Sequence, residues 1–404
     1  MGASVTPRRN PAEDRVPDSA DERTWWHRFL DRFSRRTSSG RFIPEVDGIR
    51  FFAIALVVAF HLDDYVGRNA VGAEPGAGGI EFAGRYLGNG NRGVQLFFVL
   101  SGFILALPFA GHFLAGRKRP SVRAYYLRRL TRLEPPYVVA MCGLAAAAVL
   151  LGTLGVSEAS RHLGASLAYA HNLIFGIPSR VNGVAWTLEV EVQFYLLAPL
   201  LARVFTVRSR PLRRGIIVAA VIVSAVLQNI FLHDEIGRAE LSLLNFVQYF
   251  LLGFLFADIY LTDWLESPRP DSRLWDAVAL VGWPTLLFVD LTTEAGRWVL
   301  PPLLFALFYA TFRGRATGSV FRRRVLTTIG GMCYSIYLLH YPLMSMLSRL
   351  TRDMEVGSYG VDLVLQALIV LPILLLVSGT FFLAVERPCM DPGWVDKVRR
   401  RLSR

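Results

Sequence analysis

The sequence is poor in charge and in cysteine. Of its 404 residues only 19% are charged, whereas 53% are apolar and the mean hydropathy is +0.38. Soluble domains carry about 25% charged residues, so this composition excludes an ordinary soluble enzyme, and so apolar a chain does not stay disordered in water. The three cysteines, Cys142, Cys333 and Cys389, form no CxxC pair and no His/Cys cluster. This spacing argues against a disulfide framework and a zinc site, and we expect no bound metal.

Lysine is also nearly absent. Only Lys118 and Lys397 occur among 44 basic residues, which face 32 acidic ones and give a net charge of +12. A basic chain can bind nucleic acid, but here the positive charge falls between long apolar runs, which favours a membrane. We therefore expect membrane lipid and no nucleic acid as a partner. The abundance of arginine and alanine is typical of a bacterium with a GC-rich genome.

Long apolar runs are what the sequence has in quantity. A helix needs about 20 mostly apolar residues to cross a bilayer. Ten runs approach this length: 49–66, 93–111, 136–155, 186–205, 214–232, 243–262, 275–291, 297–312, 326–347 and 361–384. The first run follows a long polar stretch, so we do not expect a cleavable signal peptide. The pattern predicts an all-α polytopic membrane protein with about ten transmembrane helices and no soluble domain.

The arginines predict how this protein lies in the membrane. If the N-terminus is cytoplasmic, 31 basic residues fall in cytoplasmic segments and nine in the opposite loops. The positive-inside rule then places both termini in the cytoplasm, in a bacterial cytoplasmic membrane. We expect residues 1–46 to form a cytoplasmic tail, disordered at first and then a basic amphipathic helix at 22–36 whose arginines face anionic lipid. Residues 47–388 would form the membrane domain and 389–404 a basic cytoplasmic tail.

The first apolar run carries two ionisable residues, which are costly in a membrane and hence candidates for function. Arg50 and His61 are eleven residues apart. At about 100° per residue they share one helix face, separated by roughly 16 Å along the axis. Arg50 would lie at the cytoplasmic boundary and His61 near the midplane. A snorkelling arginine and a packed histidine explain this pattern equally well.

Two other runs place polar residues at a similar depth. Glu191 in the fourth run and His340 in the ninth each lie roughly 21 Å from the inner end of their run, close to the depth of His61. The fourth run also holds Glu189. Polar groups from three helices at one depth favour a shared polar cavity. In the second run, close helix packing explains Ser101 better than a nucleophile does, because no GxSxG elbow surrounds it.

A pair of arginines precedes the third run. Arg129 and Arg132 are three residues apart and face one side of a helix. Two guanidinium groups so placed suit bidentate recognition of phosphate. Anchoring at the inner membrane surface explains their charge as well.

Five stretches in matching order resemble the acyltransferase-3 family of integral membrane O-acyltransferases. They are Arg50 with His61, Gly93–Phe103, Arg129 and Arg132 with Pro136 and Tyr137, Trp186–Tyr195, and Cys333–His340. The resemblance extends from residue 47 to about 388. Val192 stands where the family pattern has a second glutamate, and Cys333 where it has serine. Glu191 is therefore the best-matched carboxylate, and Glu189 is left without a counterpart.

The resemblance implies transfer of a short acyl group, acetyl or similar, from acyl-CoA to a hydroxyl of a sugar, glycoconjugate or polyketide acceptor, with no permanently bound cofactor. Arg50, Arg129 and Arg132 would hold the donor, and His61 would be the general base. Glu191 would orient His61 or bind the acceptor, and an acyl-histidine intermediate is the alternative mechanism. The residues expected to contact substrates are Ser101, Trp186, Tyr195, Tyr334 and His340. Because the esterase-like domain fused to some family members is absent from this sequence, we expect direct delivery to the acceptor or a carrier.

Two other classes of protein compete with this interpretation. A glycolipid transporter or flippase also uses polar residues at mid-depth, but it would consume no acyl donor. A structural membrane scaffold is disfavoured by five polar motifs in order.

Overall fold

The computed structural model describes residues 30–35, 42–69, 87–231, 237–265, 272–351, 354, 358–391 and 393–394. Within these residues the chain is helical and has no strand, apart from one isolated bridge between Ser272 and Gly314. The all-α prediction is confirmed for this part. Most of the two predicted tails, residues 1–29 and 395–404, lies outside the described residues.

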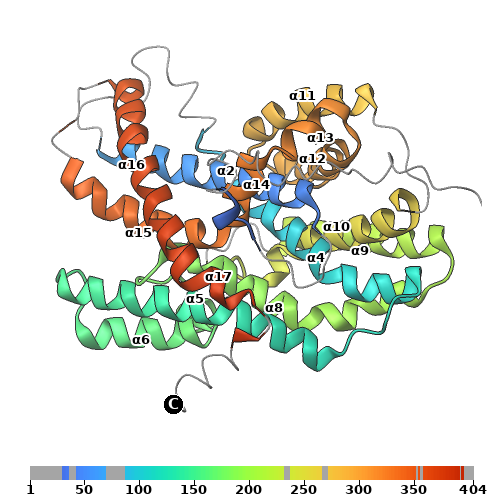
Figure 1. Cartoon of the computed structure of the whole chain (residues 1–404), viewed down its shortest axis with the longest axis horizontal. Coiled ribbons are helices and arrows are strands. Elements are labelled where there is room, and N and C mark those ends of the chain that lie inside the picture. Colours follow the sequence, from blue (N-terminus) through green and yellow to red (C-terminus); the bar gives the residue numbers. More distant parts are fainter. Residues whose placement is uncertain are drawn as a thin grey trace, which may run out of the picture.

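The helices follow one another in the order drawn in Figure 1. The α-helices are α2 (Pro44–Asn69), α4 (Arg92–Ala115), α5 (Val122–Leu150), α6 (Val156–Leu167), α7 (His171–Phe175), α8 (Trp186–Leu201), α9 (Arg210–Phe231), α10 (Val247–Ile259), α11 (Arg273–Phe288), α12 (Glu294–Arg313), α13 (Arg315–Phe321), α14 (Arg324–Gly331), α15 (Cys333–Thr351), α16 (Tyr359–Phe381) and α17 (Arg387–Cys389). Short 3₁₀ segments are η2 (Gly183–Ala185), η3 (Ala202–Thr206) and η4 (Leu243–Asn245), and π segments are η5 (Tyr260–Trp264) and η7 (Phe382–Glu386).

Six helical stretches of the described chain are long and apolar enough to cross a membrane. They are Arg92–Ala115, Val122–Leu150, Gly183–Thr206, Arg210–Ile230, Glu294–Arg313 and Tyr359–Cys389. The other four predicted spans fall on α2, on α10 with η5, on α11 and on α14 with α15, which do not meet the same criteria. Helix α11 has only 16 residues, and the predicted span 326–347 is interrupted at Met332. Length and composition therefore support six membrane crossings, and the count of ten stays a prediction.

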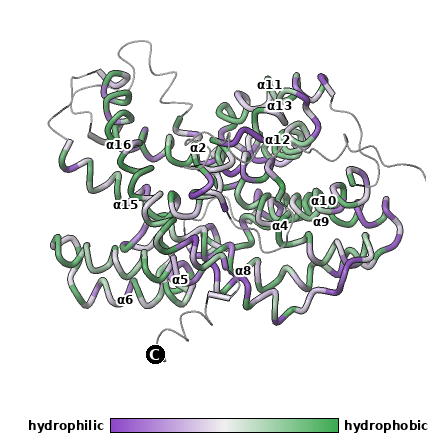
Figure 2. The backbone as a smooth tube through the Cα atoms, viewed as in Figure 1, coloured by the Kyte–Doolittle hydropathy of each residue, from purple (hydrophilic) through white to green (hydrophobic). Residues whose placement is uncertain are grey.

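Apolar side chains on the outside of the molecule fit a lipid environment. Figure 2 shows long hydrophobic stretches along α5, α9 and α16. Among their residues, Leu150 is 86% exposed, Ile230 65% and Leu376 71%. Apolar surface on this scale is costly in water but not against lipid.

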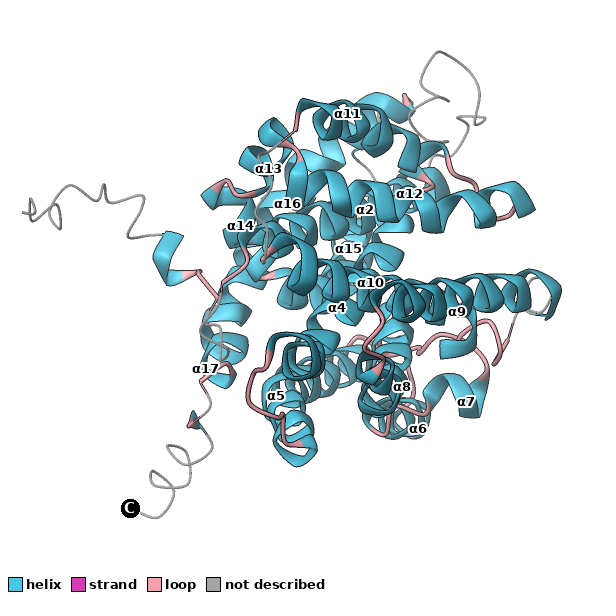
Figure 3. Cartoon of the chain, turned by 90° about the vertical axis from the view of Figure 1, so that its right-hand side faces the viewer, coloured by secondary structure: helices cyan, strands magenta, loops and turns pink. Residues whose placement is uncertain are grey.

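The contact between α4 and α10 is at the centre of the fold. In Figure 3 these two helices lie between α2, α11 and α12 on one side and α5, α6 and α8 on the other. A Cβ on Gly102 would lie 2.1 Å from the carbonyl oxygen of Phe250, and one on Gly253 would lie 2.3 Å from that of Val99. Only glycine allows this approach, as the small residues of the second apolar run predict. The backbone of α4 is thereby fixed close to the helices that carry the polar candidates.

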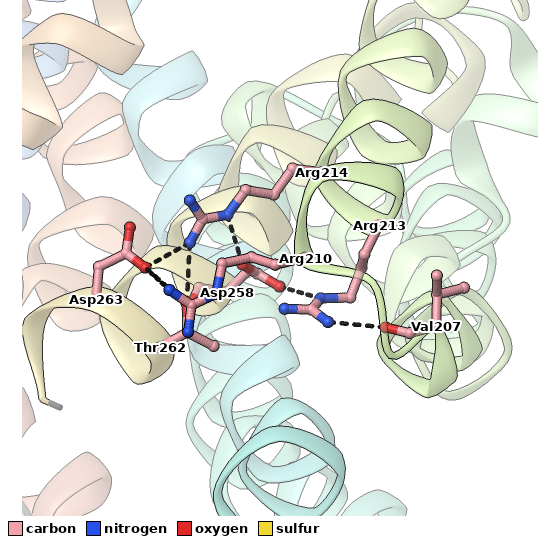
Figure 4. A network of polar contacts seen from close by, with 7 residues as sticks. All are labelled: Val207, Arg210, Arg213, Arg214, Asp258, Thr262 and Asp263. Carbon is pink, nitrogen blue, oxygen red and sulfur yellow. Dashed lines mark hydrogen bonds and ion pairs between the residues drawn. The ribbon is translucent and has the colours of Figure 1, made fainter.

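The buried Arg213 and the half-buried Arg214 connect the start of α9 to the end of α10, as Figure 4 shows. Asp258 is fully buried and accepts hydrogen bonds from the Nε atoms of Arg213 and Arg214, the latter at 2.8 Å. Arg214 also donates to Thr262 Oγ1 at 2.9 Å and to Asp263 Oδ1 at 2.8 Å. Each guanidinium of this network thus has a carboxylate partner.

The described part of the predicted amphipathic segment packs against the membrane domain. Leu30 is buried, and the ring of Phe33 lies next to Gly379 of α16. Arg35 pairs with Asp47 of α2, with 3.2 Å between Nη1 and Oδ1. The sequence pattern predicted that the arginines of this segment face lipid, whereas the side chain of Arg35 faces the protein interior.

Candidate active site

A cavity of about 120 Å³ is formed by residues of α2, α4, α5, α8 and α15. Seven of the ten residues proposed from the sequence line it: Arg50, Ser101, Arg129, Arg132, Glu191, Tyr195 and Tyr334. His61, Trp186 and His340 are not among its lining residues. Helices far apart in the chain therefore bring most of the candidate residues to one place.

The charge of this cavity is predominantly positive. Four arginines line it, against two carboxylates, Glu191 and Glu386. Two of the arginines, Arg35 and Arg50, share the buried carboxylate of Asp47.

Arg129 and Arg132 differ from the other two arginines. The guanidinium of Arg129 lies over the ring of Tyr195, 5.5 Å from its centroid. Within the described residues, neither Arg129 nor Arg132 forms an ion pair with a carboxylate. Both groups keep unused donors, and such donors bind phosphate or carboxylate well in a partly buried cavity.

The two carboxylates of the cavity bind serines instead of arginines. Ser101 Oγ donates to Glu191 Oε1, and Ser335 donates to Glu386 Oε2 through its hydroxyl and its backbone N–H, the latter at 3.1 Å. We interpreted Ser101 as a packing residue, but the close helix contact is made by Gly102, and the Ser101 hydroxyl lies in the cavity.

His61 and His340 lie next to each other behind the cavity. Their ring centroids are 5.1 Å apart, and the ring of Tyr341 is 4.9 Å from that of His61. Tyr337 lines the cavity, and its ring centroid is 5.5 Å from that of His340. The depth argument thus brings the two histidines together, whereas Glu191 lies in the cavity itself, with Tyr337 between the two groups.

Two residues of the fourth apolar run, one aromatic and one acidic, lie outside the cavity. Trp186 packs against Phe246, with ring centroids 5.4 Å apart. Glu189 is fully buried, and its Oε2 accepts the backbone N–H of Asn172 at 2.8 Å. Glu189 therefore holds the segment before α8, and Glu191 alone of the two glutamates faces the cavity.

A second histidine pair lies between α6 and α7. His162 Nδ1 is 2.7 Å from His171 Nε2, and His171 Nδ1 donates to the carbonyl of Ile177 at 3.1 Å. Burial, with a further contribution from His162, lowers the pKa of His171 to about 4. Burial lowers the pKa of His162 as well, and both ring nitrogens of His171 have hydrogen-bond partners.

Sequence reasoning missed Arg35 and Asp47 of the cavity region. Asp47 could have been found, because it lies three residues before Arg50 and hence on the same helix face. No local pattern places Arg35 in the cavity, since a separate segment brings it there. Tyr337 and Glu386 also line the cavity and were not among the residues proposed from the sequence.

Comparisons with known proteins identify the family of the chain. A family model described as an acyltransferase domain matches residues 43–385. The chain is 24% identical to the O-acetyltransferase OatA of Staphylococcus aureus over 358 residues, which cover 82% of this chain and 55% of the relative. It is 25% identical to the putative peptidoglycan O-acetyltransferase YrhL of Bacillus subtilis over 395 residues, which cover 90% of this chain and 57% of the relative.

The chain thus spans little more than half the length of these curated relatives. No solved structure matches it. Because the family model covers most of the sequence and the motifs meet around one cavity, the chain belongs to the acyltransferase-3 family.

Proposed function

We propose that the chain is a membrane-embedded O-acyltransferase that moves a short acyl group, such as acetyl, from acyl-CoA to a hydroxyl of a sugar or glycoconjugate. The names of its relatives, an O-acetyltransferase and a putative peptidoglycan O-acetyltransferase, support this acceptor class over a polyketide. The observation that carries the proposal is the cavity in which Arg129 and Arg132 form no ion pair with a carboxylate of the described residues.

The cavity suits the donor because CoA carries its phosphate groups at the nucleotide end, from which a narrow pantetheine arm extends to the thioester. Arg129 and Arg132 would bind phosphate oxygens through paired N–H donors, and each charged hydrogen bond is worth about 1.5–3 kcal/mol. The arm would then run past Tyr337 and bring the thioester to the histidines. A transporter for glycolipids has no need of this phosphate site.

His61 would act as the general base. It takes the proton of the acceptor hydroxyl while that oxygen attacks the thioester carbonyl, and the CoA sulfur leaves and receives a proton. Glu191, fixed by the Ser101 hydroxyl, would orient the acceptor at the cavity side of Tyr337. The apolar walls limit access of water and hence hydrolysis of the thioester.

A transfer assay tests the function. Purified full chain in nanodiscs is mixed with labelled acetyl-CoA and N-acetylglucosamine oligomers, and acetylated sugar is measured. We expect wild type to transfer acetyl and His61→Ala to lose about 10²–10⁴-fold in turnover while still binding CoA. As a control, His112→Ala should keep full turnover, because that ring bonds only to the carbonyl of Arg117 at the end of α4.

Three outcomes of this assay decide between the alternatives. Absence of donor consumption by wild type would refute the enzyme in favour of a transporter. Normal turnover of His61→Ala would refute the base. A labelled acetyl group trapped on His61 without acceptor would establish the covalent route.

We also propose that the arginine cavity opens to the cytoplasm, where acyl-CoA is found. Reporter fusions after residues 118 and 400 should then report cytoplasmic, and fusions after 90 and 240 the opposite side. A cytoplasmic signal at 90 together with an external one at 118 would reverse the orientation and remove the donor from the cavity.

A further inference from the structure

His340 holds its two ring nitrogens in different environments. The side chain is fully buried on α15, and Nδ1 lies 2.7 Å from the carbonyl oxygen of Tyr337 and 3.2 Å from that of Ile336. Carbonyl oxygens only accept hydrogen bonds, so Nδ1 carries the proton and donates it. The neutral ring therefore has a lone pair at Nε2, and within the described residues Nε2 has no hydrogen-bond partner.

A buried lone pair without a partner is costly, so a role for it is expected. A candidate partner is the ring of His61, whose centroid is 5.1 Å from that of His340. The other histidine pair of this chain shows what that spacing allows. The centroids of His162 and His171 are 5.0 Å apart, and the pair is joined by an N···N contact of 2.7 Å.

We propose that His340 is a positioning residue for His61: when the His61 ring turns toward it, His340 Nε2 accepts a ring N–H of His61 and leaves the other His61 nitrogen unprotonated. This inference rests on the proposed function, in which that nitrogen takes the hydroxyl proton of the acceptor. His340 touches neither substrate and acts through His61. It does what a carboxylate does for the base in a catalytic triad, but without placing a charge among apolar helices.

The proton balance of the reaction is preserved. The acceptor O–H bond breaks, its proton moves to His61, and the oxygen forms the new ester bond as the carbon–sulfur bond of the thioester breaks. During this step the positive charge of His61 is shared with His340 through the N–H···N bond, while Nδ1 of His340 stays bound to the Tyr337 carbonyl. The proton then passes from His61 to the CoA sulfur, and both rings return to the neutral form.

Two substitutions separate a positioning role from a packing role. In His340→Asn the side-chain amide can still donate to the Tyr337 carbonyl, but no atom remains where Nε2 was. In His340→Gln the longer amide oxygen can accept the N–H of His61. In metal sites, loss of a residue that orients a ligating histidine typically lowers metal affinity or activity about 10–100-fold. We therefore expect His340→Asn to lose that factor in kcat at an unchanged KM for acetyl-CoA, and His340→Gln to recover a large part of it. His112→Asn, at a ring that also bonds to a backbone carbonyl, should leave kcat unchanged.

A spectroscopic readout keeps this test independent of the transfer reaction. In ¹⁵N-histidine spectra of the full chain, His61 should be a single tautomer in wild type and in His340→Gln, and a mixture of tautomers in His340→Asn. If His340→Asn keeps kcat and the His61 tautomer while His340→Gln loses them, the role is packing and the proposal is wrong. If wild type transfers no acetyl, the proposed function fails, and the tautomer result still decides the pairing of the two histidines.

Discussion

Two groups of arginines in this molecule look alike in the sequence and differ in the structure. Arg213 and Arg214 at the start of α9 bind the carboxylate of Asp258. Arg129 and Arg132 on α5 line a cavity and have no carboxylate partner within the described residues. Charge alone does not tell a structural arginine from one that binds a ligand. The two kinds of arginine are told apart by whether a carboxylate already neutralises the charge.

The physical reason is the cost of burying charge. A buried guanidinium must be paired and hydrogen-bonded, and a network that is complete has nothing left for a ligand. In the α9 network (Figure 4) each guanidinium is paired with a carboxylate, and Arg213 also donates to the carbonyl of Val207 at 2.7 Å. The α5 pair keeps unused donors, which a polyanionic ligand would satisfy.

The largest loss of stability is expected from a substitution in the α9 network, where the arginines are paired. Asp258→Asn leaves Arg213, which is 2% exposed, without a charge partner. Removing one member of a buried pair typically costs about 3–5 kcal/mol. We expect a large loss of thermal stability and of folded protein after detergent extraction, measured by thermal unfolding and size-exclusion chromatography. Wild-type stability of Asp258→Asn would show that the α9 network is not structural.

A substitution in the cavity should have a smaller effect, on the KM for the donor and not on stability. Arg132→Ala should fold as well as wild type and raise the KM for acyl-CoA about tenfold or more, because it removes a charged contact worth about 1.5–3 kcal/mol. Arg132→Lys should recover only part of this, since lysine lacks the bidentate fork. Arg128→Ala is the matched control, since Arg128 is exposed on the same helix outside the cavity. A change in acceptor KM alone would contradict the phosphate role.

The smallest effect is expected at the exposed edge of the α9 network. Arg210 is 48% exposed and pairs with Asp263 at 3.2 Å. Exposed ion pairs are worth about 0–1 kcal/mol, so Arg210→Ala should lower the melting temperature only slightly and leave KM unchanged. A loss as large as that of Asp258→Asn would mean that exposure does not separate the members of this network.

The sequence predicted the all-helical fold and most of the cavity because both depend on regular spacing. Apolar runs of helical length predict the helices, and polar residues inside them are costly enough to indicate a site. The close α4–α10 contact also follows from its glycines. Helix ends were predicted less well: the predicted span 326–347 runs through the turn at Met332 between α14 and α15, although Gly330 and Gly331 directly before it are a turn signal.

What the sequence could not predict depends on contacts between distant segments. Arg35 reaches the cavity only because its segment packs on α2, and Tyr337 separates the histidines from Glu191 only in three dimensions. The sequence also does not show which arginines are paired with a carboxylate. Nothing local shows that Asp258, on another helix, pairs with Arg213 and Arg214, whereas Arg129 and Arg132 form no ion pair within the part of the chain that the structure describes.

The most direct test of the central claim is the thermal shift produced by CoA alone, without acyl transfer. A ligand at about a hundred times its Kd stabilises the folded state by about 2.7 kcal/mol, so CoA should raise the melting temperature of wild type and of Arg210→Ala equally. The double variant Arg129→Ala/Arg132→Ala should melt near wild type without CoA and lose most of the shift. An undiminished shift in that double variant would show that the donor binds elsewhere.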